Sequence, residues 1–332
     1  NSSLTIMFDM VSRSYTHGVL GNTPWSRLDK VKFLCPVPGY DRHFGVTEYF
    51  GAEMINVPMT PEGPDMDLVE KLVAEDDSIK GIWCVPKYSN PQGISYSDET
   101  VRRFAALKPA AADFRIYWDN AYCVHHLYQE PEKQDQILNI IEECEKAGNP
   151  DMVYEFVSSS KISYAGSGIA AVASSAANLA EIKRHMNFQT IGHDKINQIR
   201  HVKFFKNVDG IYACMMKHAD ILRPKFEAVV RILDAELGGL GNWDSWSMPR
   251  GGYFISFDAM PGCARTIVDM AKEAGLVMTE AGATYPYHKD PADSNIRIAP
   301  SCPTMEELEA ASDVFVLSVR LASVRKLLEK MG

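Results

Sequence analysis

Residues 114–122 read F-R-I-Y-W-D-N-A-Y, and this stretch decides the fold class. The large apolar side chains of Phe114–Trp118 predict a buried strand, and the polar Asp119 and Asn120 mark its end. Other short apolar runs with the same character, most of them bounded by Pro, Gly, Asn or Asp, are Val31–Cys35, Met54–Val57, Ile79–Val85, Met152–Val157 and Gly168–Ala173. The sequence therefore predicts a series of short buried strands.

Helical patterns lie between some of these strands. Met66–Ala74 carries an apolar stripe, and Ser97 is a typical N-cap before an acidic first turn. Asp135–Ala147 is a third amphipathic candidate. Alternation of strands and helices predicts an α/β fold, with a mainly parallel sheet that has helices on both faces.

The pattern changes after about residue 205. Asp209–Leu237 predicts one long or bent helix, which is followed by Gly/Trp-rich turns and a strand at Gly252–Phe257. Further predicted elements are a helix at Arg265–Ala274, a strand at Ile296–Ala299, and a terminal helix opened by the capping box T-x-x-E at 304–307. We therefore expect a large domain over residues 1–215 and a smaller α+β C-terminal domain over residues 216–332.

Composition excludes several classes of protein. The chain has 332 residues, 46% hydrophobic and 23% charged, with a net charge of −9. An acidic chain is poorly suited to capture nucleic acid, and no stretch approaches the roughly 20 apolar residues of a membrane span. Seven scattered cysteines without a C-x-x-C pair indicate neither a disulfide framework nor a zinc site, so we expect a cytoplasmic protein without a metal. Because the chain begins at Asn1 without a Met, we also expect a missing upstream segment.

Familiar nucleotide and hydrolase motifs are absent. The sequence has no G-x-G-x-x-G after a strand, no G-x-x-x-x-G-K-S/T, no G-x-S-x-G and no H-E-x-x-H. The chemistry must therefore come from another set of residues.

The ends of three predicted strands carry polar side chains. One strand ends in Asp119, another leads to Lys161, and a third is followed by the turn Asn90-Pro91. Each residue alone fits an ordinary role, namely a helix N-cap, a solvated loop charge and a turn. Because the carboxyl ends of parallel strands meet at one edge of a sheet, we expect all three to face one crevice.

This combination meets the chemical needs of pyridoxal phosphate. The cofactor needs a lysine for a Schiff base, an aspartate that keeps its ring nitrogen protonated, and donors for its 3′-oxygen. Its phosphate favours hydroxyls and backbone N–H groups at a helix N-terminus, which Ser158 and the Ser2-Ser3 turn can supply. The sequence therefore predicts a pyridoxal-phosphate site.

The motifs together resemble a known family. They are N-S-S-L at 1–4, P-G-Y-D at 38–41, K-Y-S-N-P-Q-G at 87–93, W-D-N-A-Y at 118–122, S-S-S-K at 158–161, P-R-G-G-Y-F at 249–254 and I-R-I-A-P-S at 296–301. In this order they resemble the class I aminotransferases of the PLP-dependent transferase fold type I. The similarity is greatest to the bacterial MocR-like group, which includes a subgroup of aspartate aminotransferases, and it covers essentially the whole chain.

The resemblance implies a role for each matching residue. Lys161 would form the Schiff base and then move the proton between the substrate Cα and the cofactor C4′. Asp119 would pair with the ring nitrogen, while Tyr122 and Asn90 would contact the 3′-oxygen. The phosphate would be bound by Ser2, Ser3 and Ser158. Arg297 would bind the substrate α-carboxylate bidentately, and Asn90 would also contact the substrate.

Two departures from the family pattern leave gaps. The arginine usually found about eight residues after the lysine is absent, so Ser167, backbone amides or a neighbouring basic group must serve the phosphate. The usual position of the ring-stacking aromatic holds Val37, so we assign stacking to Tyr40. The resemblance also implies a homodimer with active sites between subunits. In such a dimer Lys195 or Arg200 of the partner would bind a distal substrate carboxylate, although a solvated helix face explains both equally well.

We therefore expect a ping-pong aminotransferase that moves an amino group between an amino acid and a 2-oxo acid, with aspartate and 2-oxoglutarate as the first substrate pair. Alanine, kynurenine and aromatic amino acids remain open as substrates. One alternative is the aminotransferase-like effector domain of a MocR-type transcription regulator. Another is a β-lyase on the same fold.

Overall fold

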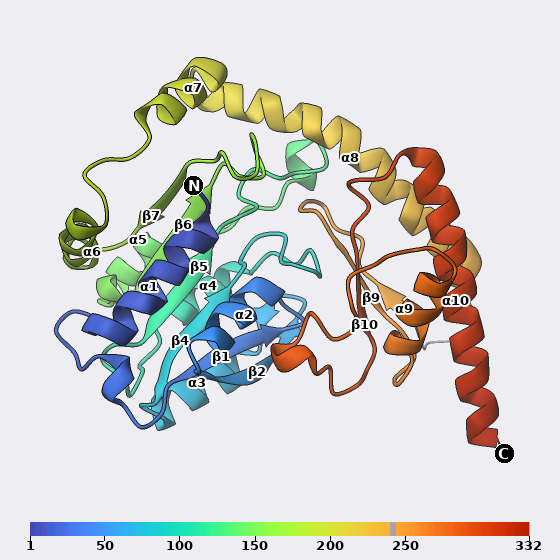
Figure 1. Cartoon of the computed structure of the whole chain (residues 1–332), viewed down its shortest axis with the longest axis horizontal. Coiled ribbons are helices and arrows are strands. Elements are labelled where there is room, and N and C mark those ends of the chain that lie inside the picture. Colours follow the sequence, from blue (N-terminus) through green and yellow to red (C-terminus); the bar gives the residue numbers. More distant parts are fainter. Residues whose placement is uncertain (240–243, 332) are drawn as a thin grey trace.

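The computed structural model describes residues 1–239 and 244–331. Its centre is a seven-stranded sheet in the order β3-β2-β1-β4-β5-β6-β7 (Figure 1). The strands are β1 (Lys32–Val37), β2 (Glu53–Thr60), β3 (Gly63–Pro64), β4 (Ile79–Cys84), β5 (Arg115–Asp119), β6 (Val153–Ser158) and β7 (Ala170–Ala173). β2, β1, β4, β5 and β6 are parallel, and the two edge strands β3 and β7 are antiparallel. The predicted α/β class is confirmed.

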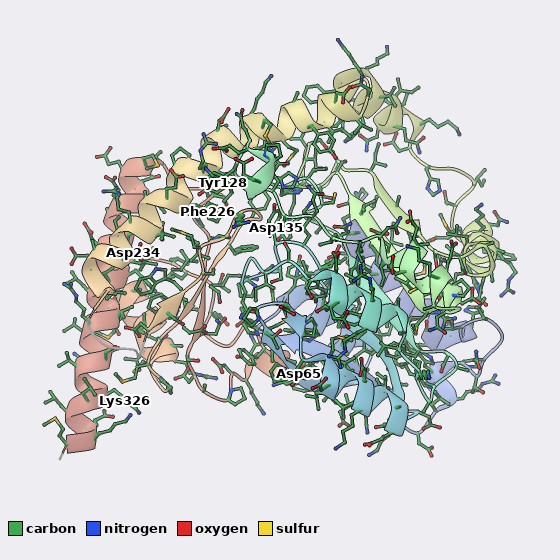
Figure 2. The ribbon with its side chains drawn as sticks, turned by 180° about the vertical axis from the view of Figure 1, so that it is seen from behind. Asp65, Tyr128, Asp135, Phe226, Asp234 and Lys326 are labelled. Atoms are coloured by element: carbon green, nitrogen blue, oxygen red, sulfur yellow. The ribbon has the colours of Figure 1, made fainter. Side chains whose placement is uncertain are left out.

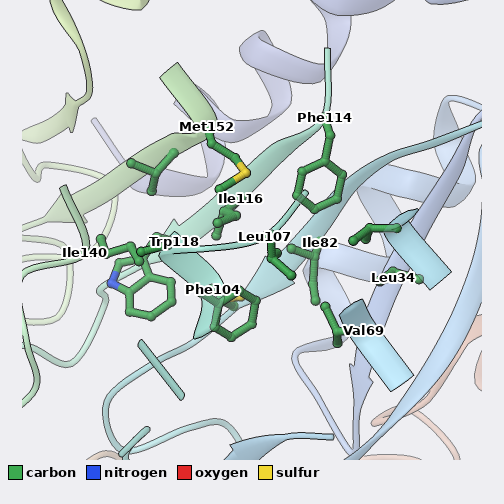
Figure 3. Close-up of a cluster of buried hydrophobic side chains, with 14 of the residues drawn as sticks. Leu34, Val69, Ile82, Phe104, Leu107, Phe114, Ile116, Trp118, Ile140 and Met152 are labelled. Atoms are coloured by element: carbon green, nitrogen blue, oxygen red, sulfur yellow. The ribbon is translucent and has the colours of Figure 1, made fainter. Parts of the chain in front are cut away.

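Helices cover both faces of this sheet because successive strand residues point to opposite sides. Leu34, Ile82 and Ile116 face the helices α3 (Met66–Glu75), α4 (Asp98–Ala105) and α5 (Ile140–Lys146), as Figure 3 shows for part of this core. Their neighbours Phe33 and Tyr117 face the other way. There they pack with α1 (Ser3–His17) and α6 (Ala176–Gln189).

A second, smaller unit surrounds a three-stranded antiparallel sheet in the order β10-β9-β8. Its strands are β8 (Ser245–Trp246), β9 (Ile255–Asp258) and β10 (Asn295–Ile298), and its helices are α9 (Ala264–Glu273) and α10 (Met305–Met331). The capping box is present, since Thr304 Oγ1 accepts from Glu307 N at 3.2 Å. Apart from β8, this unit has the predicted order of elements.

The long helix α8 (Val208–Leu237) leads from the large sheet to the small one (Figure 1). It follows α7 (Lys195–Phe205), and its later turns place Phe226 and Leu233 in the core of the smaller unit. Leu127 joins the same core. The neighbouring Tyr128 packs against it and donates its hydroxyl to Glu227 at 3.4 Å (Figure 2). The helix α8 therefore joins the two units and contributes to the core of the smaller one.

Some predicted bounds are wrong. The helix predicted at Asp135–Ala147 begins only at Ile140, because the Asn139 side chain caps it and Asp135 N instead donates to Tyr88 Oη at 3.0 Å. The strand predicted from Gly252 begins at Ile255, since Gly252 has a positive φ of 82°. Part of the predicted Gly/Trp-rich turn, residues 240–243, lies outside the described residues.

α2 (Asp41–Tyr49) and α6 have no counterpart among the predicted elements, nor have the two-residue strands β3 and β8. Helices and strands this short or this weakly patterned give little periodic signal.

Candidate active site

The carboxyl ends of β4, β5 and β6 meet at one edge of the large sheet, because these strands are parallel neighbours. Asp119 is the last residue of β5, and its side chain is buried. Ser158 ends β6, and Lys161 follows three residues later. Asn90 lies in the loop after β4 and is also buried. The three strand ends predicted to share a crevice therefore do lie at a common edge.

The carboxylate of Asp119 is held on one side only. His43 Nε2 lies 3.1 Å from Oδ2, and the His43 ring stacks on Trp83 with ring centres 4.6 Å apart. Trp83 is fixed in turn because its Nε1 donates to Thr47 Oγ1 at 2.8 Å. The other oxygen, Oδ1, is buried without a hydrogen-bond partner among the described residues. A buried carboxylate oxygen left in this state needs a donor from elsewhere.

Lys161 lies against two aromatic rings. Its Nζ is 4.7 Å from the ring centre of Tyr122 and 5.9 Å from that of Tyr40. The backbone of the lysine is held separately, since Tyr253 Oη donates to Lys161 O at 3.1 Å. The ammonium group can therefore move while the loop that carries it stays in place.

Burial and the nearby charges shift the pKa values of the two tyrosines. Burial raises the pKa of Tyr122 far above its usual value, and Asp119 adds to the effect while Arg297 opposes it. Burial likewise raises the pKa of Tyr40, against the lowering effect of Lys161. Both phenols therefore remain hydrogen-bond donors at neutral pH.

Arg297 lies on β10, in the smaller unit, and reaches toward the larger one. Its Nη1 donates to Asn90 Oδ1 at 3.2 Å and to Asp41 Oδ1 at 2.7 Å, while its guanidinium carbon lies 4.8 Å from the ring centre of Phe254. Arg297 Nε is buried without a partner among the residues described. Asn90 and Arg297, which were each predicted to bind substrate, are thus in direct contact.

Two of the predicted phosphate residues, Ser2 and Ser3, lie at the N-terminus of α1, and the third, Ser158, ends β6. Ser2 caps this helix by accepting from Thr5 N at 3.3 Å, and Ser3 is its first residue. Asn1 joins this helix end to the loop after β6, because Asn1 O accepts from Ser160 Oγ at 3.2 Å and Asn1 Nδ2 donates to Gly166 O at 3.0 Å. The N–H groups of a helix N-terminus attract anions, so this end of the site suits a phosphate.

A side-chain network from α7 holds the loop that follows Lys161. His201 Nε2 lies 2.7 Å from Ser163 Oγ and 3.1 Å from Ser159 Oγ. Asn197 Nδ2 donates to Ser167 O at 2.9 Å, and Arg200 lies beside it, with Nη2 3.4 Å from the same carbonyl. His201 and Asn197 were not predicted, since contacts between segments so far apart in the chain leave no local pattern.

Two further histidines at the site were also missed. His43 stands three residues after Tyr40, one helical turn away, which is the signal that could have indicated it. His125 is buried between the rings of Tyr122 and Tyr253, at centre distances of 5.4 and 5.5 Å. Burial lowers the pKa of His125 to about 3, so this ring is neutral at physiological pH.

The described residues contain no group of three or more His, Cys, Asp or Glu side chains that could hold a metal ion. Across the same residues, no helix combines the length and the apolar character needed to cross a membrane.

The site fits pyridoxal phosphate on its own geometry. The unpartnered Oδ1 of Asp119 can accept from a protonated ring nitrogen, a lysine stands nearby, and a helix N-terminus lies beside the lysine loop. Together with the fold, this arrangement is characteristic of the PLP-dependent transferase fold type I.

The comparisons with known proteins identify the family. The model of the aspartate amino-transferase family matches residues 1–331, so the chain belongs to this family. An aspartate aminotransferase of Corynebacterium glutamicum is 47% identical over 324 residues, which cover 97% of this chain and 74% of that protein. The crystal structure of an aspartate transaminase from the same species has a TM-score of 0.95 and 46% identity, and the match covers 98% of this chain and 76% of that one.

A more distant structure shows the fold alone. The α-aminoadipate aminotransferase of Thermus thermophilus, solved in complex with N-(5′-phosphopyridoxyl)-L-leucine, has a TM-score of 0.79 at 17% identity. The match covers 97% of this chain and 76% of that structure. Because the chain belongs to the aspartate amino-transferase family, it is an aminotransferase, and its substrates are an amino acid and a 2-oxo acid.

Proposed function

We propose that this aminotransferase moves the amino group of L-aspartate to 2-oxoglutarate, with pyridoxal 5′-phosphate as cofactor. The observation that carries the proposal is the buried Oδ1 of Asp119, which lacks a partner among the described residues at the sheet edge that also holds Lys161. The choice of aspartate is supported by the curated sequence and the solved structure from Corynebacterium glutamicum, which both carry the name of an aspartate aminotransferase.

The cofactor contacts that we propose are those implied by the family resemblance. Asp119 would accept from the ring nitrogen, Tyr122 and Asn90 would donate to the 3′-oxygen, and Tyr40 would stack on the ring. The phosphate would be bound by Ser2, Ser3 and Ser158. When bound, the cofactor would withdraw electrons from the substrate Cα.

The chain itself would position the substrate and move its proton. Arg297 would bind the α-carboxylate, because its buried Nε is free to donate. Lys161 would take the proton from Cα of the amino acid and return it on the other side of the amino nitrogen, at C4′ of the cofactor. Its place beside the Tyr122 ring supports this role, since Nζ lies within the site and makes no hydrogen bond with the described residues.

The division of the chain follows the two sheets. We propose a large cofactor-binding domain over residues 1–215 and a small domain over residues 216–332. The free state of the seven described cysteines is consistent with the reducing environment of the cytoplasm.

We further propose a homodimer with active sites at the subunit interface. The region from α6 to the start of α8 exposes apolar side chains that a second subunit would cover, namely Phe188, Ile191, Ile196, Ile199, Val202, Phe204 and Val208. Lys195 and Arg200 lie on α7 within the same region, so they are the candidates for a distal substrate carboxylate across the interface.

An absorbance titration tests the proposed function. With cofactor bound, the visible band should disappear on addition of L-aspartate and return on addition of 2-oxoglutarate. Lys161→Ala should abolish this cycle, whereas Lys71→Ala, on the exposed face of α3, should leave it intact. A band indifferent to aspartate would reject the substrate. Ammonia release without any 2-oxo acid would favour a β-lyase, and normal turnover by Lys161→Ala would refute the site.

A further inference from the structure

Asp41 and Arg297 form an ion pair across the two units of the chain. Asp41 is the first residue of α2, beside the large sheet, and Arg297 belongs to β10 of the small sheet. Asp41 Oδ1 lies 2.7 Å from Nη1 of Arg297. The arginine side chain is only 10% exposed and the aspartate 28%, so the pair is largely shielded from solvent. Such a charge-assisted hydrogen bond is stronger than one in open water.

The hydrogen bonds of Arg297 all lie on one side of the guanidinium group. Nη1 donates to both Asp41 and Asn90, which occupy its two protons. Nε is buried and has no partner in the part of the chain that the structure describes. The side that carries Nε therefore remains for a ligand, and a planar guanidinium presents two parallel N–H donors along that side.

Phe254 restricts the guanidinium further, because the Arg297 Cζ lies 4.8 Å from its ring centre. The Phe254 ring and the two acceptors at Nη1, Asp41 and Asn90, together fix the plane of the guanidinium and its rotation in that plane. Of these three contacts only Asp41 carries a charge, so it contributes most to holding the cation in a buried place.

We propose that Asp41 is a positioning residue for substrate binding. It holds Nη1 of Arg297 so that the Nε side of the guanidinium faces the α-carboxylate of the substrate. This inference rests on the proposed function, in which Arg297 binds that carboxylate. Asp41 itself touches neither the substrate nor the cofactor in this role.

The ordinary explanation for Asp41 is that an acidic residue in the first turn stabilises a helix. The chain contains a matched case that separates the two roles. Asp67 is the first-turn acid of α3 and forms an ion pair with Arg103, and neither residue belongs to the proposed site. Loss of Asp67 thus removes a helix-end charge and an ion pair without disturbing Arg297.

The test compares Asp41→Ala, Asp41→Asn and Asp67→Ala as cofactor-loaded enzymes. Steady-state kinetics with L-aspartate and 2-oxoglutarate give KM and kcat, and maleate serves as an unreactive dicarboxylate whose inhibition constant reports binding alone. Asp41→Ala should raise both KM values and the maleate constant about tenfold with kcat changed less than about threefold, because one charge-assisted hydrogen bond is lost. Asp67→Ala should match the wild type.

Asp41→Asn separates position from charge. Its amide oxygen can still accept from Nη1, but this hydrogen bond is weaker because the acceptor no longer carries a charge. We therefore expect its KM values to lie between those of the wild type and those of Asp41→Ala. If Asp41→Asn is as impaired as Asp41→Ala, or if Asp41→Ala binds maleate normally, the positioning role is wrong.

An Arg297→Lys variant distinguishes failure of this inference from failure of the proposed function. If Arg297→Lys raises KM strongly while Asp41→Ala has no effect, only the role of Asp41 is rejected. If Arg297→Lys leaves KM unchanged, the carboxylate site itself is wrong, and the inference falls with it.

Discussion

Replacement of Gly251 by Ala should destabilise the protein, because the site has no room for a methyl group. A Cβ atom on residue 251 would lie 2.3 Å from Cε2 of Tyr88 and 2.5 Å from the carbonyl oxygen of His125. Carbon atoms normally approach to about 3.5–4.0 Å, so one neighbour must move by roughly 1 Å. Tyr88 cannot yield easily, since its hydroxyl bonds to His126 Nδ1 at 2.7 Å and to Asp135 N at 3.0 Å.

The expected loss has two parts. Overpacking in a tight region costs about 1–3 kcal/mol. The shift also strains the backbone hydrogen bonds from Gly252 N to His125 O and from Leu127 N to Arg250 O, and loss of one such bond costs about 1 kcal/mol. We therefore expect the free energy of unfolding of Gly251→Ala to fall by about 3 kcal/mol.

Urea unfolding followed by circular dichroism measures this difference, and Gly45→Ala is the matched control. Gly45 lies inside α2, and a Cβ atom there would have no heavy atom within 4 Å beyond its own helix backbone and chain neighbours. Alanine at this position should therefore stabilise the helix by about 0.5–1 kcal/mol. The same substitution thus has opposite signs at the two glycines. If the free energy of unfolding of Gly251→Ala lies within about 0.5 kcal/mol of the wild-type value, the packing argument is refuted.

Three further predictions concern stability. Burial lowers the pKa of His125 to about 3 and that of His126 to about 4. Both histidines therefore stay neutral in the folded protein, while the unfolded chain takes up protons below about pH 6.5. In urea titrations, the free energy of unfolding should fall by up to about 1.4 kcal/mol per pH unit for each histidine as the pH drops from about 6.5 to about 5. Lys80→Met leaves the carboxylate of Asp113 without its buried cation, 2.7 Å away, and should cost about 3–5 kcal/mol in the same assay. Asp194→Ala removes the N-cap of α7 and should cost about 1 kcal/mol, with faster amide hydrogen exchange confined to the start of that helix.

Much of the fold could be predicted because its signals are local. The strands β4, β5 and β6 are short apolar runs with Pro, Asn or Asp at their ends, and the parallel arrangement then places Asp119, Lys161 and Asn90 at one edge. The T-x-x-E capping box likewise needed only four residues. Such features depend on neighbouring residues alone, so one sequence is enough to reveal them.

The remaining features depend on contacts between distant segments. Residues 135–139 have a helical pattern but stay non-helical, because Asp135 N bonds to Tyr88 instead of continuing a helix. The pair of Asp41 and Arg297 joins residues 256 positions apart. His201 contacts Ser159, although β7 and α6 lie between the two residues in the chain. No periodicity or spacing in the sequence indicates these contacts.

Three of the main residues of the site are held in a similar way, each at an atom other than the one that remains available. Asp119 is held at Oδ2 by His43, which leaves Oδ1 available, and Arg297 is held at Nη1, which leaves Nε available. Lys161 is held through its carbonyl oxygen by Tyr253, which leaves Nζ available. Each holding residue comes from an element other than the one that carries the held side chain. Substitution of a holding residue should therefore weaken ligand binding or turnover while the reacting atom itself remains, and this separates positioning from chemistry at each of the three places.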